Sequence, residues 1–422
     1  MISEIENQIL RSISAAKAYQ HVENICEFGN RLAGSEADNK AAEYFAKTCS
    51  EYGLYTYFEE FEADCFEPIT CELSLVEPES KNIESQPMIF SPSTSEGGIT
   101  SELIDVGAGK EEDYKGKNTK NKIVLFTRGF DKHTFFTEIC MASKYGALGA
   151  IMANYQSWAF HGTLETFSFE PEDRLLPIEP NPIPAINISL EDGHYLRECL
   201  LKYEKVKVHL RLQAITEKRV TQNVRCLLPG TSLPQERLIL GGHHDTQNTP
   251  AADDNTSGLG VLLELARVLS AYPCKRTIEF YSPGCEEIRS LGSWEYCKRH
   301  KSDLQNIVAF LDVDGVGGGG DLNIITEGWW PGNKKLIAPE WLCLFVDKVA
   351  RELNYKTKFG ICELGTSDEG RFLDAGVPSV FLWKPWEEHY HSLQDIPEYV
   401  DPNTLKVVGE ISGLAAWRLA NR

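Results

Sequence analysis

The sequence lacks the local signatures of several protein classes. Its 12 cysteines include no CxxC pair, which argues against a zinc ribbon or a thioredoxin-like motif. Its 62 acidic residues outnumber 42 Lys and Arg, and a net charge of -20 argues against binding nucleic acid or an anionic membrane surface. No run of about 18 apolar residues is present, as a membrane-spanning helix requires. The HExxH and GxSxG motifs, which mark other hydrolases, are also absent.

The composition is that of a folded protein with more than one domain. A chain of 422 residues with 42% hydrophobic residues predicts two or three domains with cores of their own. Glu4 and Glu6 stand where a signal peptide would be basic. We therefore expect a cytoplasmic protein whose thiols are mostly reduced.

The chain has two parts that differ in their predicted secondary structure. Over about 60–215, strand-like runs at 121–126, 149–154, 184–189 and 205–212 alternate with loops rich in Gly, Pro and acids, which predicts a β-rich module. Beyond it, short apolar strands at 237–242, 277–282, 306–313 and 379–383 alternate with helical stretches. That alternation predicts a mostly parallel sheet covered by helices. One amphipathic helix is expected over 2–27, and another over about 36–52.

Acids and histidines stand where the strands of the second part end. They are His243, His244, Asp245, Asp253, Asp254, Glu286, Glu287, Asp314, His389 and His391. In an open α/β sheet, ligands bind beyond the carboxyl ends of the strands. Each piece alone is more often a helix cap or a solvated charge. Together they predict a metal site, because mixed nitrogen and oxygen ligands suit zinc and a shared carboxylate suits two ions.

These segments also resemble a known family. HHD, PAADDNTSG, GCEEIRSLGS, LDVDGVG and YHSLQD are similar, in order and spacing, to the five ligand segments of the co-catalytic zinc aminopeptidases. That family includes bacterial leucyl and yeast vacuolar aminopeptidases, plasma carboxypeptidases and glutamate carboxypeptidases. RLAGSEADNKAAEY resembles its N-terminal segment.

The resemblance implies the zinc exopeptidase fold, a mostly parallel mixed α/β sheet between helices, for residues 1–62 and 214–422. Residues 63–213 look like an inserted β-rich protease-associated domain, through NKIVLFTRG and PIPAINISLEDG.

The resemblance also implies a ligand set for two Zn²⁺ ions. The ligands would be His243, Asp254, Glu287, Asp314 and His391, with Asp254 bridging both ions. Two doublets and one pair of histidines two residues apart leave a choice of register, and His244, Asp253 and His389 are the competing candidates. HxD spacing favours His243, the following Asn favours Asp254, and the continuation HSLQD favours His391.

Three further residues receive roles from the same resemblance. Asp245 would orient a metal ligand through a hydrogen bond, and Glu286 would be the general base. Tyr390 would donate to the oxyanion, although a tyrosine here could equally be packing. A cis peptide between Asp254 and Asn255 is also implied. In GTSDEG, Thr366 and Glu369 read more simply as a helix capping box, although the family has a Ser-Asp near its site here.

The function implied is a zinc-dependent exopeptidase that removes N-terminal residues from peptides, by means of a metal-bridged water and a glutamate base. Three further readings stay open: a single-zinc acyltransferase similar to glutaminyl cyclases, a carboxypeptidase of the same family, and a non-catalytic binding protein. No residue of the sequence can be assigned to hold a free terminus. We expect a peptide substrate and neither nucleic acid nor membrane as a partner.

Overall fold

The computed structural model describes residues 2–129, 136–157, 182–330, 334–362, 366–384 and 388–422. It divides into two compact units. The first holds Met1–Ala63, Arg219–Tyr390 and Gln394–Arg422, and the second holds Asp64–Lys218 with His391–Leu393. The sequence suggested boundaries after residues 62 and 213. That the second unit is a protease-associated domain stays a prediction.

The first unit is built on a mixed sheet. Its strand order is β13 (Lys334–Ile337), β12 (Leu322–Trp330), β15 (Ser379–Trp383), β11 (Ile307–Val313), β9 (Leu233–Gly241), β10 (Arg276–Ser282) and the end of β8 (Lys207–Leu228). β15, β11, β9 and β10 run parallel. β8 is antiparallel to β10, and β12 is antiparallel to both β15 and β13. β14 (Thr357–Cys362) pairs with β12 in parallel. The four strands predicted from apolar runs are the four parallel ones, which confirms the fold class.

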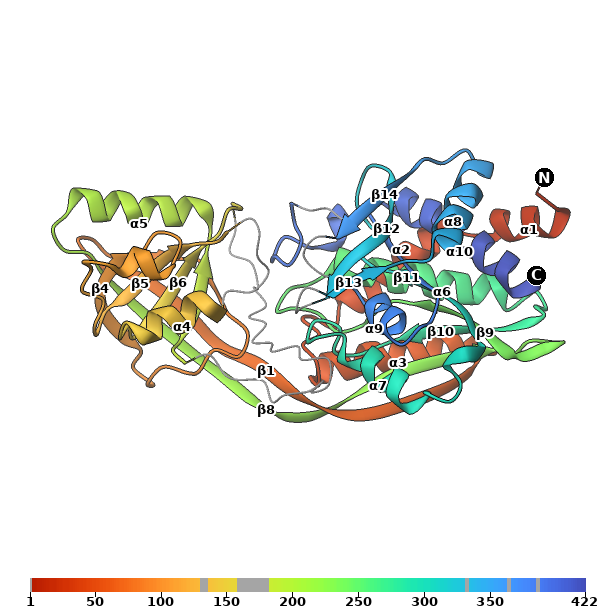
Figure 1. Cartoon of the computed structure of the whole chain (residues 1–422), viewed down its shortest axis with the longest axis horizontal. Helices are drawn as coiled ribbons and strands as arrows, with labels where there is room; N and C mark the ends of the chain where they lie inside the picture. The colour runs from red at the N-terminus through yellow and green to blue at the C-terminus, as the bar shows by residue number, and fades with distance from the viewer. Residues whose placement is uncertain (1, 130–135, 158–181, 331–333, 363–365, 385–387) are drawn as a thin grey trace. The chain divides into compact units, whose positions relative to one another are not determined.

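Helices cover both faces of this sheet (Figure 1). They are α1 (Glu4–Ser12), α2 (Ala15–Cys26), α3 (Glu36–Glu51), α6 (Gly258–Leu269), α7 (Leu291–Arg299), α8 (Glu340–Glu352), α9 (Glu369–Asp374) and α10 (Pro402–Asn421). The single helix expected over 2–27 is wrong. Ile13 is extended, and Ser14 caps α2 by accepting from the amide of Lys17, so the segment breaks into two helices.

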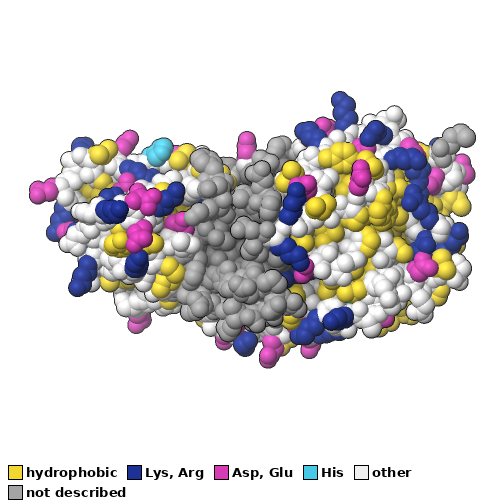
Figure 2. Space-filling model, viewed as in Figure 1, with side chains coloured by type: hydrophobic (Ala, Val, Ile, Leu, Met, Phe, Trp, Pro, Cys, Tyr) yellow, Lys and Arg dark blue, Asp and Glu magenta, His cyan; other side chains and the backbone are white. Residues whose placement is uncertain are grey.

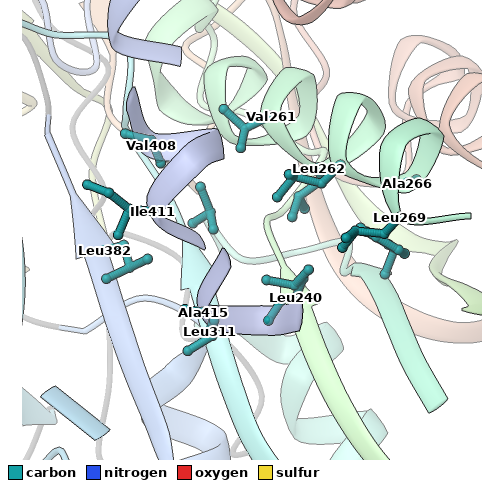
Figure 3. Packing of buried hydrophobic residues seen from close by; sticks show 14 of the residues in the cluster. Leu240, Val261, Leu262, Ala266, Leu269, Leu311, Leu382, Val408, Ile411 and Ala415 are labelled. Atoms are coloured by element: carbon teal, nitrogen blue, oxygen red, sulfur yellow. The ribbon is translucent and has the colours of Figure 1, made fainter. Parts of the chain in front are cut away.

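Alternate residues of the strands supply the two cores. Leu238 and Leu240 of β9 belong to the larger core, and Ile239 belongs to the smaller one with Tyr296 and Phe372. Figure 3 shows the larger core between strands, α6 and α10. Its labelled members are Leu240, Leu311, Leu382, Val261, Leu262, Ala266, Leu269, Val408, Ile411 and Ala415. The packing of α6 against the sheet matters for the site, because α6 begins directly after the loop of Asp254.

The second unit has its own sheet and core. β4 (Ile99–Asp105), β5 (Ile123–Thr127), β6 (Gly149–Ala153) and β7 (Ala185–Ile188) are parallel neighbours. β3 (Ser85–Pro87) is antiparallel to β7, β8 is antiparallel to β4, and β2 (Lys81–Ile83) is antiparallel to β1 (Tyr55–Glu77). Two helices, α4 (Phe136–Lys144) and α5 (Leu190–Lys202), join the strands. This unit is therefore an α/β structure, whereas the sequence predicted a β-rich module.

The surface is mixed in charge. Figure 2 shows basic and acidic side chains interspersed over the described residues of this face, without a broad basic field. Within the described part of the chain, no helix combines the length and apolarity needed to cross a membrane. The structure records no disulfide among the cysteines that it describes.

Candidate metal centre

The predicted ligands sit at one edge of the parallel sheet. His243 follows β9 by two residues, Asp314 follows β11 directly, and Glu287 follows β10 in a short loop. Because β9, β10 and β11 are parallel neighbours, their carboxyl ends meet at the same edge. Asp254 lies in the tight turn Ala252–Ser257 that leads into α6. The chain order of the strands therefore explains why residues far apart in sequence converge.

His243, Asp254 and Asp314 form the first ligand group. The Nε2 atom of His243 lies 3.1 Å from Oδ1 of Asp254 and 3.4 Å from Oδ1 of Asp314. Burial would lower the pKa of His243, but the carboxylates of Asp314 and Asp254 hold it well above its usual value. Burial and the neighbouring Asp254 carboxylate raise the pKa of Asp314, against the effect of His243. A cation would relieve the repulsion between these buried carboxylates.

Asp254, Glu287 and His391 form the second group. One potential ligand atom from each lies within 4.8 Å of the others, as is also true of the first group. Asp254 belongs to both groups, and each group offers one imidazole nitrogen and two carboxylates. This donor set fits zinc, which takes histidine nitrogen and carboxylate oxygen. All five predicted ligands are thus brought together, in two groups that share the predicted bridging residue.

Asp245 connects the segments that carry the ligands. Its backbone oxygen lies 3.0 Å from Nδ1 of His243. Its carboxylate accepts from the amides of Glu286 at 2.9 Å and of Glu287 at 3.2 Å. Asp245 therefore contacts both His243 and the segment after β10 that carries Glu286 and Glu287.

Glu286 and Tyr390 both face the carboxylates of the site. Burial, together with the carboxylates of Asp368 and Glu287, raises the pKa of Glu286 well above its usual value, against the effect of His243. Burial and the carboxylates of Asp254 and Glu287 likewise raise the pKa of Tyr390. The surroundings therefore favour the protonated form of both groups.

His244, the other histidine of the first doublet, lies outside both ligand groups. Nδ1 of His244 lies 2.9 Å from the hydroxyl of Ser282, and its Nε2 lies 3.4 Å from Oδ1 of Asp38. Burial lowers the pKa of His244 to about 4. Ser282, His244 and Asp38 have the residue types of a serine-hydrolase triad, but each is 0% exposed, so no substrate reaches them.

Asp253 and His389 also have neighbours outside the ligand groups. Oδ1 of Asp253 accepts from the amide of Gly317 at 2.6 Å. The ring of His389 stacks on Tyr399 with 4.1 Å between centroids. Neither residue belongs to a ligand group that the described residues form.

The structure adds contacts that the sequence did not indicate. Gln247 donates from its backbone amide and its side chain to the two oxygens of Glu287, at 3.2 and 2.7 Å. Ser367 donates to Oδ2 of Asp314 at 2.6 Å. No local pattern marks Gln247, whereas the family's Ser-Asp in GTSDEG was a signal for Ser367.

The capping box expected in GTSDEG is wrong. α9 begins at Glu369, and its N-cap residue Asp368 makes no side-chain capping bond. The Glu369 carboxylate instead accepts from the amide of Ser367 at 2.8 Å. Burial raises the pKa of Asp368 to about 7 and that of Glu369 to about 8. This segment therefore contributes acids to the site.

The loop that carries Asp254 has an unusual backbone. The peptide between Asp254 and Asn255 is cis, which confirms that expectation. Ala251 adopts the left-handed conformation, with φ 51° and ψ 54°. The side chain of Asn255 donates to the carbonyl of Val313 at 3.0 Å and accepts from the amide of Gly258 at 3.0 Å. Asn255 thereby ties the loop to both the end of β11 and the start of α6.

Comparison with known proteins relates this geometry to a family. Residues 223–416 match peptidase family M28. The chain is 25% identical to aminopeptidase YwaD of Bacillus subtilis (strain 168), over 100% of this chain and 88% of that protein. It is 23% identical to carboxypeptidase Q of Xenopus laevis, over 93% of this chain and 83% of that protein.

Solved structures agree with the fold. An aminopeptidase from Aneurinibacillus sp. strain AM-1 superimposes with a TM-score of 0.73 at 25% identity, over 99% of this chain and 96% of that one. The zinc aminopeptidase BSAP of Bacillus subtilis gives a TM-score of 0.77 at 24% identity, over 97% and 96%. These matches confirm the resemblance inferred from the ligand segments. Residues 223–416, which carry all five predicted ligands, are therefore similar to peptidase family M28.

Proposed function

We propose that the chain is a zinc-dependent aminopeptidase that binds two zinc ions and removes N-terminal residues from peptides. The observation that carries the proposal is the pair of ligand groups that share Asp254, in a chain whose residues 223–416 match peptidase family M28. His243 and Asp314 would hold one ion, and Glu287 and His391 the other. Bound zinc lowers the pKa of a water ligand and polarises a carbonyl oxygen.

The protein's own side chains would handle the protons. Glu286 would take a proton from the attacking water and return it to the leaving amine nitrogen. The hydroxyl of Tyr390 would donate to the oxygen on which negative charge develops. Asp245 would keep the imidazole of His243 in place, because its backbone oxygen accepts from Nδ1.

Two observations favour an aminopeptidase over a carboxypeptidase, a cyclase or a binding protein: the share of this chain that each relative matches, and the set of metal-ligand atoms. The relative named an aminopeptidase is matched over 100% of this chain, and carboxypeptidase Q over 93%. The second ligand group supports two ions rather than the single zinc of a cyclase. The intact donor set speaks against a binding protein without catalysis.

The test is hydrolysis of a panel of dipeptides with free, N-blocked and C-amidated ends, with added zinc and with chelator. We expect cleavage only when the amino group is free, and none in chelator. Cleavage that requires a free carboxylate would make the chain a carboxypeptidase. Metal analysis should give two zinc ions per chain, and one ion with cyclisation of an N-terminal glutamine would support the cyclase instead.

Replacing Glu286→Gln tests the proton transfer. We expect kcat to fall about 10²–10⁴-fold, because a glutamine cannot accept the proton. Zinc content should stay unchanged, since Glu286 belongs to neither ligand group. Glu295→Gln is the matched control: Glu295 lies in α7 and pairs with the exposed Lys298. Full turnover in the Glu286 variant would contradict the mechanism.

We also propose that residues 63–213 are an inserted protease-associated domain. The compact second unit with its own core supports this assignment. The cytoplasmic location stays a prediction from the sequence.

A further inference from the structure

Arg31 is a buried cation that hydrogen bonds to backbone carbonyls rather than to acids. Its side chain is 0% exposed. Its Nε donates to the carbonyl of His244 at 3.0 Å, and Nη1 donates to those of Gly29 and Pro250, both at 3.3 Å. Nη2 donates to the carbonyl of Ala251 at 3.2 Å and to the hydroxyl of Thr256 at 2.6 Å. All five N–H groups of the guanidinium are therefore used.

Four of these five acceptors belong to the two segments that carry His243 and Asp254. The carbonyl of His244 follows the first zinc ligand directly. Residues 250, 251 and 256 lie on either side of the bridging residue Asp254. The backbone of Arg31 adds two bonds to Thr246, one from its amide to the hydroxyl and one from the Thr246 amide to its carbonyl, both at 2.9 Å. Arg31 thus joins the two segments at their backbones.

Asp395 accepts hydrogen bonds from backbone amides of the same loop. Its Oδ1 accepts from the amide of Asp253 at 2.7 Å, and its Oδ2 accepts from the amide of Asp254 at 3.1 Å. Its backbone carbonyl accepts from the amide of Ala252 at 3.1 Å. Asp395 is 2% exposed. The guanidinium of Arg31 therefore binds carbonyls of the loop, while the carboxyl oxygens of Asp395 bind its amides.

We propose that Arg31 and Asp395 are positioning residues that clamp the loop 250–256 from its two polar sides and so set the distance between His243 and Asp254. The inference rests on the proposed zinc-dependent function, because Asp254 is the ligand common to both groups. Neither residue contributes a ligand atom to the two groups. Each acts through the backbone on either side of the bridging carboxylate.

Arg225 shows why these contacts are unlike an ordinary buried ion pair. Arg225 is 8% exposed, and its guanidinium binds the carboxylates of Glu59 at 2.8 Å and Glu279 at 2.5 Å. Such a pair satisfies two acids, but it holds no metal-bearing loop. Arg225 therefore serves as a matched control for the general cost of losing a buried arginine from the first unit.

The experiment measures zinc affinity by competition with a chromophoric chelator, alongside the melting temperature of the metal-free protein. In Arg31→Lys the charge is kept, but the five-donor fork is lost. In Asp395→Asn one acceptor becomes a donor that faces an amide. We expect both variants to raise the zinc Kd about 10–100-fold, as changes to residues that orient ligands do. Arg225→Lys should lower the melting temperature and leave the zinc Kd within about twofold of the wild type.

Excess zinc should restore most of kcat in Arg31→Lys and Asp395→Asn, because their catalytic groups are intact. Wild-type zinc affinity in both variants, with a melting temperature lowered as in Arg225→Lys, would overturn the clamp and leave only a structural role. If Arg31→Lys does not fold, Asp395→Asn and Thr256→Val carry the test, since Thr256 offers the shortest of the five bonds. Failure of the proposed function would show separately, as a wild-type protein that binds no zinc.

Discussion

Asp254 is the residue on which both ligand groups depend. Its carboxylate reaches His243 on one side and shares the second group with Glu287 and His391. Its amide is held by Asp395. The position of one carboxylate is therefore determined by contacts from distant parts of the chain.

Ala251 is the residue at which this loop departs from the usual backbone. The left-handed conformation, φ 51°, shows a cost, because a Cβ in this region raises the energy by about 1–2 kcal/mol.

Replacing Ala251→Gly should therefore stabilise the protein by up to about 1 kcal/mol, after the greater freedom of glycine in the unfolded chain is subtracted. Denaturant unfolding measures the change. Ala252→Gly is the control, because Ala252 lies in the next position, buried in the larger core and without a positive φ. That variant should lose about 1 kcal/mol or more. Equal destabilisation by the two glycines would contradict the interpretation.

At the scale of elements, the break between α1 and α2 and the close packing of α2 on α6 determine where the loop of Asp254 lies. Ser14 ends the continuous amphipathic pattern, and its amide donates to Glu264 of α6 at 2.7 Å. α2 then packs against α6, which starts directly after the loop of Asp254. Periodicity predicted the apolar face of these helices, but it could not show where a polar contact interrupts them.

Gly260 allows α2 and α6 to come close. A Cβ built on Gly260 would lie 2.6 Å from the carbonyl oxygen of Ala18 and 3.0 Å from a methyl of Val22. Gly260→Ala should therefore lower the free energy of unfolding by about 1–3 kcal/mol, despite the better helix propensity of alanine. The variant should also weaken zinc binding, because α6 begins directly after the loop of Asp254.

Gly409→Ala in α10 is the control for that change. The nearest atom to its Cβ would be a methyl of Ile13 at 3.2 Å, which can move slightly. We expect this variant to be between neutral and about 1 kcal/mol more stable. Thermal unfolding of both variants, with and without zinc, separates the two cases. A Gly260 variant as stable as the Gly409 variant would show that the helices adjust freely.

At the scale of the whole molecule, the buried acids of the site link stability to metal and pH. Burial raises the pKa of Asp368 to about 7 and of Glu369 to about 8, above the values of 3.8 and 4.5 for the free groups. The unfolded chain releases these two protons near pH 4, whereas the folded metal-free chain keeps them until about pH 7 to 8. Between these pH values the folded state binds more protons than the unfolded state. Folding stability must fall over that range.

We expect the melting temperature of the chelator-treated protein to be lower at pH 8.5 than at pH 6. The zinc-bound protein should change less, because the cation favours the ionised carboxylates. The stabilisation by zinc should consequently be larger at pH 8.5. Asp368→Asn should flatten the dependence of the metal-free form. A metal-free melting temperature that rises from pH 6 to pH 8.5 would contradict the linkage.

Local patterns in the sequence predicted the strands of the parallel sheet, the resemblance to zinc aminopeptidases and the set of five candidate ligands. Apolar runs mark buried strands, and the acids and imidazoles that follow them must meet at one edge of a parallel sheet. These are local patterns combined with one rule of topology. The roles of the site residues stay proposals.

The three-dimensional arrangement shows which member of each candidate pair lies in a ligand group of the described residues. His243 and His244 are adjacent, and their separation depends on where β9 ends against β10. The tertiary structure also brought Arg31, Gln247, Ser367 and Asp395 against the segments that carry the candidate ligands. These contacts join segments far apart in the chain, and a hydrogen bond between distant residues leaves no period in the sequence that could predict it.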